Sequence, residues 1–488
     1  MQELPRTTIS RSIMNNVRPQ LKLLNEEQIQ QAHGYALRIL AETGVRVNSP
    51  SVLERLGKTK QVEVQGRSVK LSADLVESAI QSAPSTIQMH DRLGNPVFIL
   101  GDDRLRFGVG VTALYYQEPV EDSLVLFTRQ HMRDLTRLGS ALPLYDVIST
   151  PGIVRDVPER LGDLYGSLEH IANTTKPLVL LVTDENEFAP VLDLFEYLHG
   201  GLGEKPFVLP YFNPVSPLVM DSATLLKMEV AIERGLPFIF SNYSMAGAST
   251  PLTPAGILSL LLAELLAGLA ISQVIKPGTP ILLGMLPVYF DMKSLLNFYD
   301  PQSLLLNLAC AEMMAYYDLP HCGTSGSGTG WGMDLIAADT YWMNTLTSAL
   351  TKGGLAPFIG DSLGSKAISP TTIVHVHEII DQALRFANGF QLDDAQAALD
   401  EIAKVGPGGS FLTSSSTLKN YKHGYFVSDI YPRWTMERWQ AEGQPDAEDV
   451  LRERTQALLS DLPIPEDYNE LIEKGGAFIR FLINDRKK

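Results

Sequence analysis

Cysteine is scarce in this chain of 488 residues, which holds only Cys310 and Cys322. Two cysteines cannot form a disulfide framework for a protein of this size. Proteins that depend on such frameworks are secreted, whereas thiols stay reduced in the cytoplasm. We therefore expect both thiols to be reduced and the protein to be cytoplasmic.

Positive charge is also in short supply. The chain has 40 Lys and Arg residues against 56 Asp and Glu residues, which gives a formal net charge of −16. Such a surface repels the phosphates of nucleic acids and anionic lipid headgroups. Nucleic acid and the membrane surface are therefore not expected partners.

Long apolar runs are missing, with one exception. The amino-terminal sequence MQELPRTTISRSIMNN has no apolar run, so it does not resemble a secretory signal. The exception is the segment 257–275, which carries Glu264 and is closed by Lys276, Pro277 and Gly278. A charge at the centre of a bilayer is costly. We expect a buried helix of a globular protein rather than a membrane span.

Several motifs that carry chemistry are absent. No GxGxxG follows the first strand and no HExxH occurs, so neither a dinucleotide fold nor a zinc-protease site is expected. His375 and His377 do not predict a metal site, because residues two apart on a helix point in different directions. The GPGG run 406–409 lacks the Lys-Ser/Thr of a P-loop, and no nucleophile elbow is present. No metal site is predicted.

The composition that remains is that of a packed globular protein, with 45% hydrophobic and 20% charged residues. Residues 1–125 begin with a helix over 26–42 and continue as short runs with period-2 patterning between turn residues. This pattern predicts an N-terminal α+β appendage that is mainly β after its helical start. A helix over 126–140 then opens the second part, residues 126–488.

A rhythm of strand, loop and helix repeats through the second part. Apolar strand candidates begin at Asp146, Pro177, Pro206, Pro237, Pro280, Leu319, Ala356 and Val405. Eight strands that alternate with helices predict an α/β fold, a parallel sheet closed into a (β/α)8 TIM barrel. An open doubly wound sheet is the alternative, which the count of eight units and the missing GxGxxG disfavour.

The predicted strands end in polar, small and aromatic residues, and barrel enzymes place their sites at these carboxyl ends. The aromatic residues there are Tyr211, Phe212, Tyr243, Tyr289, Phe290, Trp331 and Phe358. Ring faces attract a methylated, cationic nitrogen, which has no proton to donate. The alternative is that these rings only fill the top of the barrel or pack under loops.

Six segments resemble blocks of one known family, in the same order along the chain. They are 213–221, 241–256, 263–268, 276–284, 362–380 and 405–412, and they include NPVSPL, AELLAG, KPGTPILLG, SKAISP and GPGG. On these blocks the chain resembles the trimethylamine methyltransferase family over nearly its whole length. The resemblance implies a (β/α)8 enzyme that moves a methyl group from a methylated amine to the cobalt of a corrinoid, or cobalamin, on a separate protein.

Two departures set this chain apart within the family. Residues 414–417 read SSST, where the family often carries His-Thr. The amine-specific members carry pyrrolysine near the positions of Gly332, Met333 and Asp334, where this chain has ordinary residues. The chain thus resembles the branch without pyrrolysine. A quaternary amine such as glycine betaine is therefore the expected substrate.

Loss of a methyl group turns a quaternary ammonium into a neutral tertiary amine, so no general acid is needed and no catalytic residue is assigned. We expect rings to bind the ammonium group and polar groups to bind a carboxylate. These residues are Tyr211, Tyr243, Trp331 and Phe358, followed by Asn213, Asn242, Ser325 and Gly408. The corrinoid is expected on the partner protein, with none tightly bound here, and the chain is expected to form a homo-oligomer.

Two other classes of protein stay open at this point. A barrel lyase or hydrolase would use Asp361 or Glu264 as its base, and a metal requirement or turnover without a corrinoid would indicate it. A non-catalytic member of the family would bind methylated amines tightly and transfer no methyl group.

Overall fold

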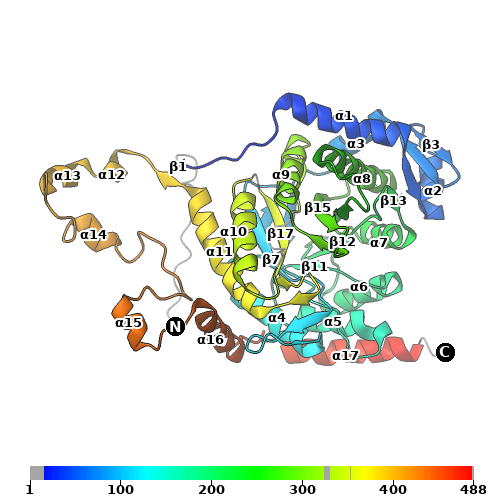
Figure 1. Cartoon of the computed structure of the whole chain (residues 1–488). Helices are drawn as coiled ribbons and strands as arrows, with labels where there is room; N and C mark the ends of the chain where they lie inside the picture. The colour runs from blue at the N-terminus through cyan, green and yellow to red at the C-terminus, as the bar shows by residue number, and fades with distance from the viewer. Residues whose placement is uncertain (1–15, 324–329, 352, 486–488) are drawn as a thin grey trace.

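An eight-stranded sheet lies at the centre of the molecule (Figure 1), which this computed structural model describes over residues 16–323, 330–351 and 353–485. In spatial order its strands are β16 (Leu296–Phe298), β15 (Ile281–Asp291), β14 (Phe238–Ala246), β12 (Val208–Phe212), β11 (Leu178–Leu180), β10 (Val147–Ser149), β7 (Leu105–Val109) and β17 (Gly354–Ile359). Neighbouring strands run parallel, except that β15 and β16 form an antiparallel pair. The sheet is therefore mainly parallel, as the alternating pattern predicts.

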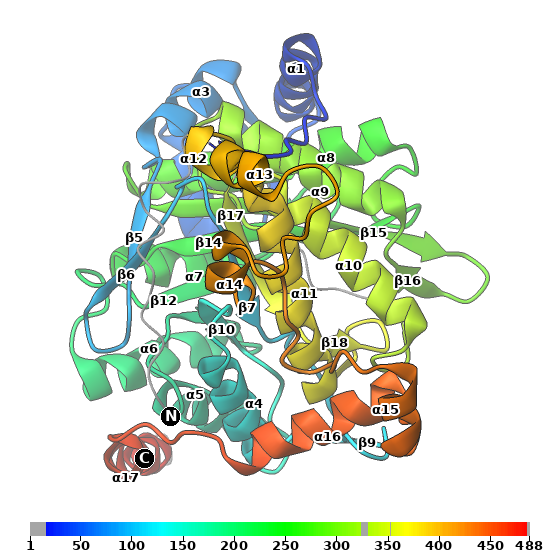
Figure 2. The ribbon, with the colours of Figure 1, turned by 90° about the vertical axis from the view of Figure 1, so that its left-hand side faces the viewer.

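Two isolated parallel bridges connect β15 with β17 at the far ends of this order. Leu283 of β15 pairs with His321, and Cys322 pairs with Leu355 of β17. Residues 321–322 thus occupy the place of the strand that the sequence predicts from Leu319. The sheet is curled, and helices surround it (Figures 1 and 2).

The helices between the strands cover the outer face of the sheet. They are α4 (Arg129–Ala141), α5 (Gly162–Ala172), α6 (Glu185–His199), α7 (Ser222–Glu233), α8 (Pro254–Ile275), α9 (Pro301–Tyr316), α10 (Leu335–Ala349) and α11 (Pro370–Asn388). A short 3-10 turn, Glu159–Leu161, precedes α5. Because side chains alternate along a strand, Leu209, Ile239 and Leu282 pack together inside the curl. Phe240 and Leu283 belong instead to the core beneath the helices.

Two expected strands are placed wrongly by the sequence pattern. β7 falls within residues 1–125, but it pairs with β10 and β17, so a division at residue 125 separates this strand from its own sheet. Residues 405–412, the eighth expected strand, form an exposed turn instead, with Gly406 and Gly408 at φ 69° and 79°. Glycine favours this left-handed backbone, which ends the preceding helix rather than extending a strand.

The N-terminal part contains more helix than its period-2 runs predict. The predicted bounds of α1 (Glu26–Glu42) are confirmed, but α2 (Pro50–Gly57) and α3 (Ala73–Ser82) were not expected. Ser49 and Ser72 cap these two helices and are the local signals that the strand patterning obscured. The strands are β2 (Val45–Val47), β3 (Val62–Gln65) and β4 (Ser68–Leu71), in one sheet with β13 (Val219–Met220), and the hairpin β5 (Ile87–His90) and β6 (Pro96–Leu100).

Helix α8 contains the apolar segment 257–275, which the sequence predicts to be a buried helix rather than a membrane span. Within the described residues it is the one helix long and apolar enough to cross a bilayer, and most of it is buried inside the protein. The helices α1, α2 and α3 pack on one side of it, and β14 and β15 lie on another. Gly268 allows the close approach to β14, because a Cβ there would lie 2.2 Å from the Phe240 ring. An apolar helix surrounded by protein is a core element.

The C-terminal part leaves the body and returns to it. A segment that we call the arm, residues 389–446, carries β20 (Phe390–Gln391), α12 (Asp394–Ala397), α13 (Leu399–Val405), α14 (Ser415–Asn420) and α15 (Met436–Ala441). The part of the arm from α12 to α14 stands away from the rest of the chain (Figure 1), and at its base β20 pairs with β1 (Asn16–Val17). Near its end, Ser428 and Tyr431 hydrogen-bond with Glu378 and His375 of α11. After the arm, α16 (Ala447–Ser460) packs on α11 and α17 (Tyr468–Asp485) packs on α5 and α6.

Candidate active site

An aromatic pair lies inside the curled sheet, where the sequence predicts the site. Tyr211 of β12 and Phe358 of β17 meet with ring centroids 5.0 Å apart and planes at 84°. Both side chains are buried. Burial raises the pKa of the Tyr211 phenol, so this ring stays neutral. The structure therefore brings together two predicted site residues that are 147 positions apart in the chain, from residue 211 to residue 358.

Tyr243 lies on β14 with 39% of its surface exposed. Its hydroxyl accepts a hydrogen bond from the Asn297 side chain on β16. Burial raises the pKa of Tyr243, and the nearby charge of Asp361 raises it further. Tyr243 is thus a neutral, partly exposed ring within electrostatic range of the Asp361 carboxylate.

Asp361 follows β17 and begins β18 (Asp361–Ser362), in a small sheet with β19 (Ala367–Ile368), β8 (Tyr115–Gln117) and β9 (Leu124–Leu126). Its Oδ1 accepts a hydrogen bond from the Tyr341 hydroxyl at 2.5 Å, and its Oδ2 accepts one from the Ser365 hydroxyl at 2.7 Å. The carboxylate is therefore held in place at the carboxyl end of β17. A buried, oriented carboxylate among neutral rings is a favourable place for a cation.

Among the described residues, no activated nucleophile or metal centre accompanies these groups. Cys322 lies on the inner face of the sheet, and burial raises the pKa of its thiol far above neutral pH. No group of three His, Cys, Asp or Glu side chains in this part of the chain is placed to hold a metal ion. The arrangement suits binding and orientation of a cation more than nucleophilic attack by the protein itself.

The residues expected to bind a carboxylate are scattered. Asn213 lies in the site, where its Nδ2 donates to the Tyr211 hydroxyl at 3.1 Å. Asn242 lies on the opposite face of β14, where its Nδ2 donates to Leu261 O at 2.9 Å and Glu264 Oε2 at 3.0 Å. The prediction for Asn242 is wrong because adjacent residues of a strand point to opposite faces.

The three other predicted residues do not join this cluster. Ser325 lies outside the described residues. Gly408 lies in the arm, between α13 and α14. Trp331 has 76% of its surface exposed and borders a separate pocket of about 300 Å³, which Asp122 and Arg452 also line. Of the rim aromatics, Phe212 points outward and packs against Phe188 of α6.

Glu264, the alternative base, accepts hydrogen bonds from three groups that hold elements of the fold together. Its Oε1 accepts from the Leu218 backbone N–H at 2.8 Å, and its Oε2 accepts from the Ser216 hydroxyl at 2.8 Å and from Asn242. Burial raises the pKa of Glu264, and these donors oppose the rise. The carboxyl group is fully buried on α8, outside the curled sheet. It joins α8 to β14 and to the NPVSPL segment.

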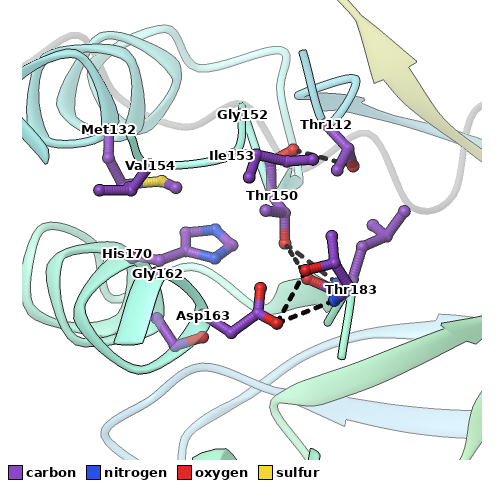
Figure 3. Close-up of a pocket in the computed structure, with 13 residues that line it drawn as sticks. Thr112, Met132, Thr150, Gly152, Ile153, Val154, Gly162, Asp163, His170 and Thr183 are labelled. Carbon is purple, nitrogen blue, oxygen red and sulfur yellow. Dashed lines mark hydrogen bonds between the residues drawn. The ribbon is translucent and has the colours of Figure 1, made fainter. Parts of the chain in front are cut away.

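A second polar pocket lies at the carboxyl ends of β7, β10 and β11 (Figure 3), and no sequence pattern predicts it. Thr112, Thr150, Asp163, His170 and Thr183 line it. Asp163 Oδ2 accepts hydrogen bonds from the Thr183 hydroxyl at 2.9 Å and from its backbone N–H at 3.1 Å. Thr112 has a φ of 54°, a conformation that is strained for a β-branched residue.

His170 of α5 points into this second pocket (Figure 3) and is almost fully buried. Burial lowers its pKa to about 4, so the imidazole is neutral at neutral pH. Within the described residues, neither ring nitrogen has a partner with normal hydrogen-bond geometry. The enclosed space is about 10 Å³, which suits one water molecule and is too small for a trimethylammonium group.

The fold is shared with a solved structure. The structure resembles that of the monomethylamine methyltransferase of Methanosarcina barkeri, with a TM-score of 0.52, 11% sequence identity and coverage of 91% of this chain and 89% of that chain. At this identity the likeness shows the fold alone. It is a mixed α/β fold with a curled, mainly parallel sheet.

The chain belongs to the trimethylamine methyltransferase family, whose sequence pattern matches residues 2–479. Over 472 residues it is 28% identical to the glycine betaine methyltransferase of Desulfitobacterium hafniense, covering 96% of this chain and 98% of that protein. It is 26% identical to a trimethylamine methyltransferase of the same species and 24% identical to one of Methanosarcina barkeri, with at least 90% of each chain covered. The resemblance stated from the sequence blocks is confirmed, and family membership supports an enzyme that transfers methyl groups.

Proposed function

We propose that the chain is a closed (β/α)8 barrel that takes a methyl group from glycine betaine, or a similar quaternary amine, and delivers it to the cobalt(I) of a corrinoid protein. The similarity to a protein named glycine betaine methyltransferase supports the substrate class. The two bridges through His321 and Cys322 support the closure of the barrel. The corrinoid belongs to the partner in this proposal, and the setting is cytoplasmic.

The observation that carries the proposal is the meeting of neutral rings and a carboxylate at the strand ends. Tyr211 and Phe358 form an edge-to-face pair, and Tyr243 lies close enough to Asp361 for the carboxylate to shift its pKa. Ring faces and a carboxylate stabilise a cation that has no hydrogen-bond donors. A primary or secondary amine would instead favour several directed acceptors.

In this proposal the chain's residues bind and orient the substrate. The rings of Tyr211, Tyr243 and Phe358 surround the ammonium group, and Asp361 balances its charge. The Asn213 amide, which donates to the Tyr211 hydroxyl, is the proposed donor to a substrate carboxylate. Cobalt(I) on the partner protein supplies the nucleophile. Exclusion of water by the buried rings strengthens the electrostatic contacts, and the neutral tertiary amine that leaves needs no proton.

The first experiment measures methyl transfer from a panel of amines to cob(I)alamin. We expect methylcobalamin to form with glycine betaine or a close quaternary analogue and not with trimethylamine. A tertiary amine is mostly protonated at neutral pH and gives up its methyl group less readily than a quaternary one. Turnover of trimethylamine as fast as that of every quaternary amine would refute the substrate assignment. Tight binding of betaine without transfer would indicate a non-catalytic member.

A second experiment separates Tyr243 from Trp331 as the ring that contacts the ammonium group. Tyr243→Ala should raise the KM for betaine about tenfold, because a desolvated cation–π contact contributes roughly 1–2 kcal/mol. Trp331→Ala should change KM less than threefold, since the Trp331 side chain is 76% exposed. Tyr243→Phe keeps the ring and serves as the control. A larger effect at Trp331 than at Tyr243 would place the ammonium site elsewhere.

A further inference from the structure

Trp331 carries an exposed indole ring on a fixed piece of backbone. Its N–H donates to Asp334 Oδ2 at 2.9 Å, and its carbonyl oxygen accepts from the buried Gln117 side chain at 2.7 Å. The carbonyl oxygen of Gly330 accepts from the Leu363 N–H at 3.0 Å. The backbone is thus held on both sides, yet 76% of Trp331 is exposed. A single exposed ring is ordinary on a protein surface, but this one borders a pocket.

This pocket, which we call the rim pocket, has a volume of about 300 Å³. Its walls come from Asp122 in the turn between β8 and β9, from residues 331–334 just before α10, from Thr371 in the first turn of α11, and from α16. Because α10 follows residues 321–322 of the sheet and α11 follows β17, the rim pocket lies at the carboxyl ends of the strands. Sites for small ligands start at roughly this volume. The aromatic residues of the candidate active site do not line the rim pocket, so it is a separate space.

Carboxylates outnumber cations around the rim pocket. Asp122, Asp334 and Glu448 line it with one guanidinium, that of Arg452, so three negative charges and one positive charge give −2. Even when Asp334 is balanced by the positive end of α10, which it caps, two carboxylates face one guanidinium and the sum is −1. Arg452 already donates to Asp122 Oδ2 at 2.6 Å and to Glu448 Oε2 at 3.5 Å. The rim pocket therefore disfavours an anion and favours a cation.

The walls of the rim pocket suit an organic cation more than a metal ion. Glu448, Leu451 and Arg452 are three and four positions apart, so one face of α16 presents all of them to the rim pocket. Leu451 and the Trp331 ring give methyl groups an apolar contact, and the face of the ring attracts positive charge. Within the described residues, no three His, Cys, Asp or Glu side chains are grouped to hold a metal ion. A quaternary ammonium ion, whose charge is spread over its methyl groups, matches these walls.

We propose that the rim pocket is a second binding site for a quaternary ammonium ion. The Trp331 ring contacts the methyl groups of the ion, and Asp122 and Glu448 balance its charge. The rim pocket is connected to the candidate active site through the backbone, because Leu363, which hydrogen-bonds to the residue before Trp331, follows Asp361 by two positions. A cation held here raises its own concentration beside that site. Only the identity of this ion as the substrate rests on the proposed function, whereas the charge and the walls of the rim pocket do not.

The first test follows tryptophan emission during titration of the full chain with tetramethylammonium chloride, against sodium chloride at equal ionic strength. We expect a saturable change that Trp331→Phe removes, because Trp331 lines the rim pocket and the other three tryptophans, all within the described residues, do not. Glu448→Gln should raise the Kd about threefold, since one carboxylate is lost. Glu453→Gln is the matched control at an exposed position of α16 outside the rim pocket, and it should leave the Kd unchanged.

Two results of this titration would overturn the proposal. One is a change in emission that Trp331→Phe leaves intact, or no saturable change at all. The other is an equal response to tert-butanol, which has three methyl groups and no charge, because the rim pocket would then bind apolar groups without selecting a cation.

The second test locates the cation directly and separates this proposal from the proposed function. Crystals of the full chain are soaked with tetramethylarsonium, which has the shape and charge of tetramethylammonium and an arsenic atom that scatters anomalously. We expect one arsenic peak beside Trp331 and another among Tyr211, Tyr243 and Phe358. A peak among those three rings alone would overturn the rim site and support the proposed function. A peak beside Trp331 alone would support the rim site and contradict the proposed ammonium site, and no peak at either place would contradict both.

Discussion

Replacing Glu264 with alanine should lower the free energy of unfolding by about 3 kcal/mol, because one buried donor and two partly buried donors lose their acceptor at about 1 kcal/mol each. The donors are the Ser216 hydroxyl, the Leu218 backbone N–H and the Asn242 amide. The Glu264 side chain itself is fully buried. Urea denaturation followed by circular dichroism measures the loss.

Two variants show whether the three hydrogen bonds cause this effect. Glu264→Gln keeps the volume and one acceptor oxygen, so its loss should be smaller than that of the alanine variant. Glu473→Ala, at an exposed position of α17, should change stability by less than about 0.5 kcal/mol. If Glu264→Ala unfolds at the same urea concentration as the unchanged protein, the buried carboxylate does not join α8 to β14.

Acidification from pH 7 to pH 4 should weaken the fold through its buried imidazoles. Burial lowers the pKa of both His170 and His321 from 6.5 to about 4. The unfolded chain therefore takes up protons below pH 6.5 that the folded chain accepts only near pH 4. Stability from these groups is complete above pH 6.5 and is lost as pH falls toward 4, by up to about 3 kcal/mol for each ring.

The pKa shift of Asp146 changes stability with pH in the opposite direction to the shifts of the two imidazoles, so the two contributions have to be measured separately. Burial raises its pKa from 3.8 to about 6, so its contribution is complete below pH 3.8 and is lost as pH rises through 6. His170→Gln with His321→Gln should flatten the fall in stability between pH 6.5 and 4. Unfolding free energies measured at several pH values across this interval test the prediction. A slope that the double variant leaves unchanged would show that other groups govern the acid response.

Several residues of the family motifs have roles in packing the fold. The Gly284 of KPGTPILLG allows β15 to approach residues 321–322, since a Cβ there would lie 1.6 Å from the Cys322 carbonyl oxygen. The Glu264 of AELLAG binds the Ser216 and Leu218 of NPVSPL. Motif order therefore identifies the family correctly, even though several of these residues hold elements together and do not line the site.

Two adjacent residues, Asn242 and Tyr243, show why the sequence alone does not predict every residue of the site. The sequence predicts that both bind the substrate. In the structure Asn242 binds Glu264 outside the sheet, whereas the Tyr243 hydroxyl accepts a hydrogen bond from Asn297. The Tyr211–Phe358 pair was predicted, because both residues end apolar strands. His170 was not, because a histidine inside a helical pattern gives no sign of the space around it.

The sequence by itself determined the family, the alternation of strands and helices, the bounds of α1 and the burial of α8. These features depend on local periodicity, on capping residues and on the order of motifs, all of which can be read along the chain. The tertiary structure alone decided that β7 belongs to the central sheet, that Trp331 is exposed and that Gly408 lies in the arm. These outcomes depend on strand register and on partners that are distant in sequence, because a side chain's surroundings are set by the elements that fold against it.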